Sequence, residues 1–244
     1  FGGDAVLYPA TVPISELGAW GIWSHYIRYI GAGAVAAGGI FSLIKALPLI
    51  IRTFAQAVRG YGKNMEEESR TAQDIPIRVV LVGILITAIV MWLIPVIPVN
   101  LPGAILIVVL GFFFATVSSR MVGLIGSSNN PVSGMAIATL LISTFVLKAT
   151  GNTGMAGMTG AIAIGSIICV IAAIAGDTSQ DLKTGFIVGA TPAKQQVGEL
   201  IGVVASGFAI AGVMSLLNKA WGFGSAEIPA PQATLMKMIV EGIM

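Results

Sequence analysis

Long apolar runs alternate with short polar stretches along most of the chain. Runs of about 20 apolar residues have the length that crosses the hydrocarbon core of a membrane as a helix. Six runs fit this description: 29–51, 77–94, 103–119, 132–149, 155–175 and 197–217. The pattern predicts an all-α fold, a polytopic transmembrane helical bundle with about six complete spans. The stretch 234–244 resembles the start of one more apolar helix, so we expect residues 1–244 to be a single transmembrane domain and a fragment of a longer chain.

The composition agrees with a membrane protein and narrows the possible chemistry. Hydrophobic residues make up 56% of the chain and charged residues 10%, whereas about a quarter of a soluble domain is charged. A net charge of +2 without a basic cluster argues against nucleic-acid binding. The chain has one His and one Cys and lacks an H-E-x-x-H motif. We therefore expect no cofactor, no metal site and no enzymatic activity.

The distribution of Lys and Arg between the spans predicts the orientation. Eight cations fall in one set of loops: Arg52, Arg59, Lys63, Arg70, Arg78, Arg120, Lys183 and Lys194. The other set holds four: Arg28, Lys148, Lys219 and Lys237. By the positive-inside rule the first set is cytoplasmic. The same rule makes the polar segment 52–76 a cytoplasmic loop.

The polar stretch GSSNNPVSG, residues 126–134, separates two predicted spans. Irregular polar backbone at membrane depth persists where it is buried in protein or lines a water-filled cavity, and transporters often build sites on such broken helices. The alternative is a short cytoplasmic loop with an Asn-Pro turn. We weigh both interpretations for five residues: Ser127, Ser128, Asn129, Asn130 and Pro131.

A second polar segment, residues 175–196, follows the fifth predicted span. Asp177 with Gln180 three residues later resembles a helix-capping pair, which predicts a short, separate helix that starts at Asp177. Asp181 would share a helix face with Asp177, with Lys183 near enough to neutralise one carboxylate. Gly185 and the Thr191-Pro192 pair would end this helix.

Glu199 lies near the start of the last predicted span. A carboxylate inside the membrane is costly and usually faces a cavity or a polar partner, which makes Glu199 a candidate proton carrier. Alternatively, the helix begins later and Glu199 is an interfacial residue near a helix N-terminus, where a negative charge is favoured.

Three stretches of the chain resemble sequences of the oligopeptide transporter (OPT) family. They are GSSNNPVSGM (126–135), AGDTSQDLKTGFIVGATPAKQQ (175–196) and RYIGAGAVAAGGIFSLIKALPLIIR (28–52), and the last is similar to the prokaryotic branch. The family includes the yellow-stripe-like metal-chelate transporters. The resemblance implies a polytopic carrier that imports small peptides or metal–chelator complexes, driven by protons. The chain would then be a fragment of a larger transporter.

The resemblance also assigns residues. One signature is Ser127, Ser128, Asn129, Asn130 and Pro131, which we expect along the substrate pathway. The other comprises Asp177, Thr178, Ser179, Gln180, Asp181, Lys183 and Gly185. Glu199, Asp177 and Asp181 are the proton-coupling candidates. The resulting hypothesis is a proton symporter in the cell membrane (the inner membrane of a bacterium), whose partners are a small peptide or metal chelate, protons, the lipid bilayer and the remaining helices of the parent chain. A passive channel-like pore and a non-transporting membrane scaffold are the alternatives.

Overall fold

The fold is a bundle of α-helices. The structure is a computed structural model that describes residues 3–31, 33–34, 37–38, 41, 44–45, 47–48, 51–52, 69–95, 97–126, 130 and 132–244. Its main helices are α1 (Ile14–Ile22), α3 (Ile77–Leu93), α4 (Leu101–Ile125), α5 (Val132–Ala149), α6 (Gly154–Val188), α7 (Pro192–Ala220) and α8 (Pro231–Ile243). A π-helical turn, η1 (Trp23–Ile27), follows α1, and a 3-10 turn, η2 (Arg70–Ala72), precedes α3. Within these described ranges there is no β-strand.

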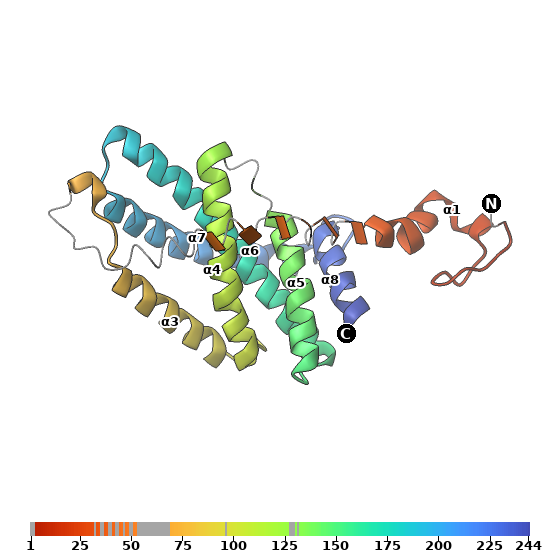
Figure 1. Cartoon of the computed structure of the whole chain (residues 1–244). Helices are drawn as coiled ribbons and strands as arrows, with labels where there is room; N and C mark the ends of the chain where they lie inside the picture. Colours follow the sequence, from red (N-terminus) through yellow and green to blue (C-terminus); the bar gives the residue numbers. More distant parts are fainter. Residues whose placement is uncertain are drawn as a thin grey trace.

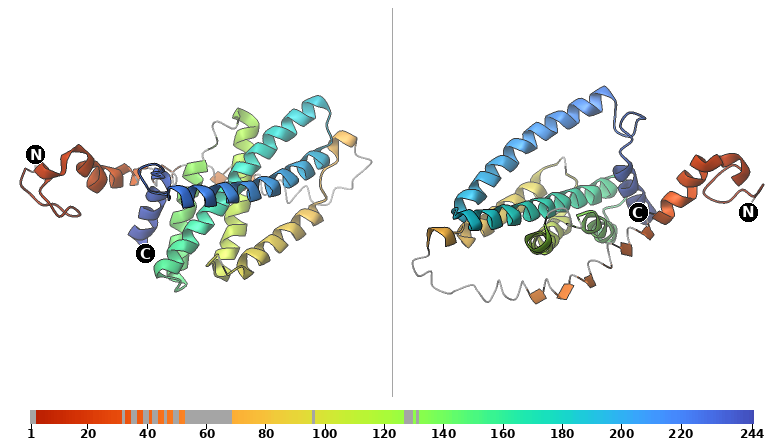
Figure 2. Two further views of the ribbon diagram at one scale, coloured as in Figure 1. Left: turned by 180° about the vertical axis from the view of Figure 1, so that it is seen from behind. Right: turned by 90° about the horizontal axis from the view of Figure 1, so that it is seen from above.

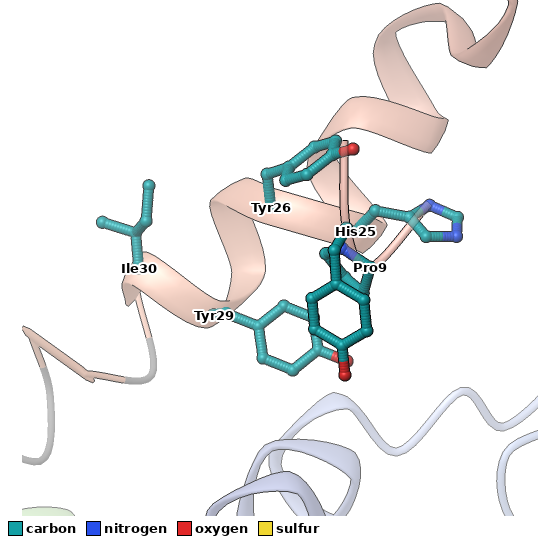
Figure 3. A pocket seen from close by; sticks show the side chains of 6 residues that line it. Pro9, His25, Tyr26, Tyr29 and Ile30 are labelled. Atoms are coloured by element: carbon teal, nitrogen blue, oxygen red, sulfur yellow. The ribbon is translucent and has the colours of Figure 1, made fainter. Parts of the chain in front are cut away.

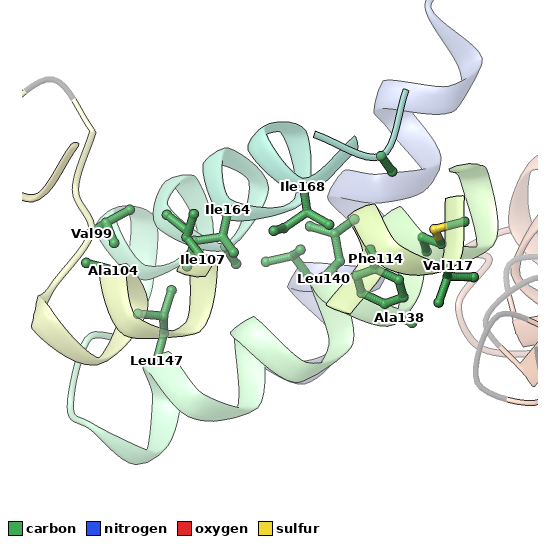
Figure 4. Packing of buried hydrophobic residues seen from close by; sticks show 14 residues of the cluster. Val99, Ala104, Ile107, Phe114, Val117, Ala138, Leu140, Leu147, Ile164 and Ile168 are labelled. Carbon is green, nitrogen blue, oxygen red and sulfur yellow. The ribbon is translucent and has the colours of Figure 1, made fainter. Parts of the chain in front are cut away.

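Helices α4, α5 and α6 form the packed centre of the molecule (Figure 1). Residues three or four apart share one face of a helix, and the buried residues follow this spacing on α4 (Ala104, Ile107, Gly111, Phe114, Val117, Ser118) and on α6 (Ala161, Ile164, Ile168, Ala172, Gly176). Helix α5 contributes further members of the cluster, among them Leu140 and Leu147 (Figure 4). The core is therefore one apolar seam that runs along α4 and α6.

Glycines allow α6 to come close to its neighbours. A Cβ atom on Gly160 would lie 2.6 Å from the carbonyl oxygen of Pro98, and one on Gly165 would lie 2.9 Å from Leu140 Cδ2. Both distances are shorter than a normal van der Waals contact. Small residues at helix contacts are typical of membrane bundles, where packing replaces the hydrophobic effect as the driving force.

Helices α3 and α7 lie outside this core and have no buried residue. Helix α7 leaves the end of α6 at a tight turn and then diverges from it (Figure 2). Its apolar side chains are exposed along most of its length; Phe208, for example, is 79% exposed. Both helices therefore present apolar surfaces of the kind that face lipid or further membrane helices. Helix α1 and η1 extend away from the bundle (Figure 1).

Five helices in the described part of the chain are long and apolar enough to cross a membrane: α3 with the turn before it, α4, α5, α6 and α7. The prediction of an all-α polytopic bundle is confirmed. Helix α5 has the predicted bounds, 132–149. The predicted first span, 29–51, and the loop 52–76 fall partly outside the described residues. Helices α4 and α7 extend beyond the predicted spans because their polar ends continue the helix.

The prediction of a separate helix that starts at Asp177 is wrong. Helix α6 continues without interruption for 35 residues, from Gly154 to Val188, so Asp177 and Gly185 lie inside it. The segment contains no Pro before residue 192, and small residues at the i, i+3 and i+4 positions keep one face packed on α4. The helix ends at Gly189, whose φ of 75° lies in the left-handed region that Gly adopts readily.

Candidate functional site

The break between α4 and α5 places one polar side chain against the middle of the bundle. Helix α4 ends at Ile125 and is followed by Gly126, which has a φ of 91°, and α5 starts at Val132. Asn130, between them, reaches across α4 and α6. Its Nδ2 donates to Ser118 Oγ of α4 at 2.7 Å and lies 3.3 Å from the carbonyl oxygen of Ala172 of α6. Asn130 therefore joins the polar break to both central helices.

Ser118 holds this arrangement together. It is fully buried, and its hydroxyl donates to the carbonyl oxygen of Ala172. Since that proton is already used, Ser118 Oγ can only accept from Asn130, and the amide atom that faces it must be the nitrogen. The hydrogen bonds alone thus determine the orientation of the Asn130 amide.

Gly176 of α6 provides the space for the Asn130 amide. A Cβ atom at this position would lie 2.9 Å from Asn130 Nδ2, 2.9 Å from Val122 Cγ2 and 3.1 Å from Ser118 Oγ. A larger residue would displace the amide. The small residue is therefore part of the site's geometry.

The oxygen atom of the Asn130 amide, unlike the nitrogen, lacks a hydrogen-bond partner among the described residues. This atom, Oδ1, is also buried. Buried polar atoms are nearly always hydrogen-bonded, so an unpaired acceptor at a candidate site is informative. Ser127, Ser128, Asn129 and Pro131, which were predicted beside Asn130 on the pathway, lie outside the described residues.

Two further polar contacts join α6 to α4 beyond this point. Ser179 Oγ donates to the carbonyl oxygen of Ser119 at 2.8 Å, and Lys183 Nζ donates to that of Gly123 at 2.8 Å. The prediction that Lys183 neutralises Asp177 or Asp181 is wrong, because its ammonium group instead donates to the carbonyl oxygen of Gly123 near the end of α4. Cations are favoured there by the helix dipole.

On its other side, α6 contacts the first turns of α7. Thr178 Oγ1 donates to Glu199 Oε2 at 2.5 Å, and Gln195 Nε2 donates to the carbonyl oxygen of Asp181 at 3.1 Å. The Gln195 amide lies directly over Gly185, where a Cβ atom would be 2.0 Å from its Oε1. Gly185 therefore permits the close contact of the two helices.

Glu199 lies well inside α7, which begins at Pro192 rather than later. The alternative in which this helix begins later than predicted is therefore wrong. Its side chain is half-buried, and Oε1 is buried with no partner in the described structure. No salt bridge to this carboxylate occurs between described residues.

The remaining acidic and polar residues of the second signature are more exposed. The side chains of Asp177, Gln180 and Asp181 face outward from α6, and only the backbone carbonyl of Asp181 contacts α7. The structure therefore separates the three proton-coupling candidates into one half-buried carboxylate and two exposed ones.

Arg70 and Gln73, which precede α3, form a clamp that holds the turn between α6 and α7. Arg70 donates to Thr191 Oγ1 at 3.2 Å and to the carbonyl oxygen of Gly189 at 2.9 Å. The backbone N–H of Ala193 donates to the carbonyl oxygen of Gln73 at 3.0 Å. The sequence indicates Arg70 only as a cytoplasmic cation, and its spacing gives no signal of this contact.

An open groove near the N-terminus is lined in part by His25 (Figure 3). The groove has a volume of about 360 Å³ and is lined by Tyr8, Pro9, His25, Tyr26, Tyr29 and Ile30. His25 Nδ1 lies 2.9 Å from the carbonyl oxygen of Gly21, a contact within its own helix. In the residues that the structure describes, no group of three or more His, Cys, Asp or Glu side chains could hold a metal ion.

Comparisons with known proteins address the family directly. A "Putative oligopeptide transporter" of Haemophilus influenzae is 32% identical over 256 aligned positions, which cover 91% of this chain and 40% of that protein. A protein of the same description from Saccharomyces cerevisiae is 32% identical over 52% of this chain and 17% of its own length. The chain thus spans well under half the length of these curated relatives. No solved structure matches the chain.

The family comparison covers nearly every residue. The model of the OPT oligopeptide transporter protein family matches residues 2–244. The resemblance inferred from the two polar signatures and the stretch 28–52 is confirmed, and a transporter family agrees with the expectation that the chain is not an enzyme. With five helices that can cross a bilayer, the chain is part of a multi-pass membrane protein. It belongs to the OPT oligopeptide transporter family.

Proposed function

We propose that the protein containing this chain is a secondary active transporter that imports oligopeptides, or peptide-like metal chelates, together with protons. Membership of the family supports transport, and the names of both curated relatives support peptides as the cargo. The transporter would lie in the cell membrane, or in the inner membrane of a bacterium, with the Lys- and Arg-rich loops in the cytoplasm.

The observation that carries proton coupling is the environment of Glu199. One carboxylate oxygen accepts a hydrogen bond from Thr178, and the other is buried without a partner among the described residues. Carboxylates within membrane-spanning helices usually face a cavity or a polar partner, and they form the proton relays of pumps and transporters. Glu199 also lies where α7 leaves α6, so its protonation would change a contact between two helices. Asp177 and Asp181 stay as further candidates on an exposed face.

The substrate pathway would follow the break between α4 and α5. Ser127, Ser128, Asn129 and Asn130 would supply neutral hydrogen-bonding groups there, and Pro131 would start the next helix. Asn130 lies against both central helices. Breaks of this kind carry substrate sites in many secondary transporters. Thr178, Ser179, Lys183 and Gly185 would keep α6 in register with α4 and α7 through the contacts described above.

Uptake into proteoliposomes that contain the full-length protein tests this proposal. A labelled tetrapeptide is supplied with and without an inward proton gradient, and a ferric chelate is added as a competitor. We expect gradient-driven peptide uptake. Glu199→Gln keeps a similar shape and can still accept from Thr178, but it cannot exchange a proton. This variant should retain peptide exchange across the membrane while losing stimulation by the gradient.

Asp177→Asn and Asp181→Asn serve as matched controls, since each neutralises an exposed carboxylate of the same region. If one of these variants abolishes gradient stimulation and Glu199→Gln does not, the coupling role moves to that residue. Peptide flux that ignores the gradient in the unmodified protein would favour a channel-like pore. Uptake no faster than in empty vesicles would contradict transport of either cargo.

A further inference from the structure

We infer that Asn130 recognises a hydrogen-bond donor of the substrate, an N–H group of a peptide, through its Oδ1 atom, and that Ser118 is the residue that positions it. This inference rests on the proposed function and specifies which chemical group of the cargo the site binds. It goes beyond the family signature, because Ser118 lies on α4, outside both polar segments.

The Asn130 amide has one orientation. Ser118 Oγ and the carbonyl oxygen of Ala172 both lie next to Asn130 Nδ2, at 2.7 and 3.3 Å. A carbonyl oxygen only accepts, and the Ser118 hydroxyl proton is already donated to that same carbonyl. An inverted amide would place its oxygen against two acceptors. The nitrogen is therefore held by the protein, and the oxygen must point elsewhere.

The oxygen atom of the Asn130 amide is available as an acceptor. Asn130 Oδ1 is buried and has no hydrogen-bond partner within the described part of the chain. Leaving a buried acceptor unpaired is unfavourable, and a native structure maintains it where a missing partner completes the hydrogen bond. A substrate that enters the break between α4 and α5 would be such a partner.

The chemistry of an amide oxygen determines which group of the substrate Asn130 Oδ1 can bind. An amide oxygen accepts hydrogen bonds and repels a carboxylate. The group it prefers is an N–H donor, which peptides carry at each backbone amide and at the terminal ammonium. Of the two ends of a peptide, the carboxylate is therefore excluded as the group that binds Asn130 Oδ1.

Ser118 acts through Asn130. In a Ser118→Ala variant, Asn130 Nδ2 would keep only the longer contact with Ala172 and the amide could rotate. The acceptor would then no longer be aimed in one direction. Ser166→Ala is a matched control, since Ser166 is an exposed serine on α6 whose hydroxyl bonds to the carbonyl oxygen of Ile162 in its own helix.

The test measures binding without transport. A series of tetrapeptides is prepared with each backbone amide N-methylated in turn, with the terminal amine acetylated, or with the C-terminal carboxylate amidated. Dissociation constants come from ligand-induced thermal stabilisation of the full-length protein in detergent. In the unmodified protein, one N-methylated or acetylated peptide should bind about tenfold more weakly, the usual effect of losing one buried hydrogen bond. The position of the effect distinguishes a backbone amide from the terminal amine.

The variants assign the effect to Asn130. In Asn130→Ala, the modified and unmodified peptides should bind equally. Ser118→Ala should reduce the tenfold difference, and Ser166→Ala should preserve it. If Asn130→Ala does not accumulate in folded form, Ser118→Ala and Ser166→Ala provide the same comparison.

Three results would overturn the inference: a discrimination that persists in Asn130→Ala, a loss of affinity caused only by amidation of the carboxylate, or no binding of any peptide. Peptides that bind with the expected discrimination but are not taken up into vesicles would contradict the proposed function alone.

Discussion

Substitution of Gly176 by Ala tests the geometry around Asn130 most directly. The new Cβ atom would lie 2.9 Å from Asn130 Nδ2 and from Val122 Cγ2, and 3.1 Å from Ser118 Oγ. Non-bonded carbon atoms normally keep about 3.5–4.0 Å. The neighbouring side chains must therefore move away by about half an ångström. The contact of Asn130 Nδ2 with Ala172, already 3.3 Å long, would then exceed hydrogen-bonding distance.

Two opposing effects set the stability of Gly176→Ala. Overpacking a close contact costs about 1–3 kcal/mol, whereas replacing Gly by Ala inside a helix contributes about 1 kcal/mol of stability. The free energy of unfolding should therefore fall by up to about 2 kcal/mol. Peptide binding should weaken by about two- to tenfold, since the displaced amide loses one ordinary hydrogen bond.

Gly202→Ala is the matched control, because nothing lies within 4 Å of a Cβ at that position on α7. Thermal unfolding in detergent and peptide titration of the full-length protein are measured for both variants. Gly202→Ala should be as stable as the unmodified protein or slightly more stable, with unchanged affinity. If Gly176→Ala matches it in both measurements, the described packing of Asn130 against α6 is wrong.

The remaining predictions concern the core and the α6–α7 turn. Phe114→Ala removes a ring that is 2% exposed, and it should lower the free energy of unfolding by about 3–5 kcal/mol in thermal or denaturant unfolding. Phe208→Ala, at a side chain that is 79% exposed, should have a much smaller effect. Equal losses in the two variants would contradict the assignment of Phe114 to the core. Arg70→Ala removes two hydrogen bonds to the α6–α7 turn and should increase the rate of limited proteolysis in that turn. Arg78→Ala, on the neighbouring helix α3, should leave this rate unchanged. Identical cleavage rates in the two variants would show that the contacts of Arg70 do not stabilise the turn.

Much of the fold could be predicted from the hydrophobic pattern because membrane spans are long and distinct. Helix α5 has the predicted bounds. The main error, at Asp177, has a physical cause: Asp and Gln three residues apart resemble a helix cap, but they are equally compatible with the polar surface of a helix that continues. The side that packs on α4 decided the outcome, through Gly176 and Ser179.

The candidate site could be predicted only in part. The polar break indicated Asn130, because adjacent Asn residues between apolar runs are unusual. Ser118 gave no comparable signal, since a Ser within a membrane helix commonly bonds to its own backbone. Its role depends on Ala172 and Asn130, which are 54 and 12 residues away along the chain. Contacts of that kind require knowledge of how α4 and α6 pack.

The uninterrupted length of α6 has a mechanical consequence. At 1.5 Å per residue, its 35 residues extend about 50 Å, well beyond the roughly 30 Å of a hydrocarbon core. A continuous helix behaves as a stiff lever, so a tilt of about 5° would move one end by about 4 Å relative to the other. Helix α6 contacts Asn130 through Gly176 and Glu199 through Thr178, and these two positions on α6 are two residues apart. A small displacement at either contact would therefore be transmitted, and enlarged, at the α6–α7 turn that Arg70 holds.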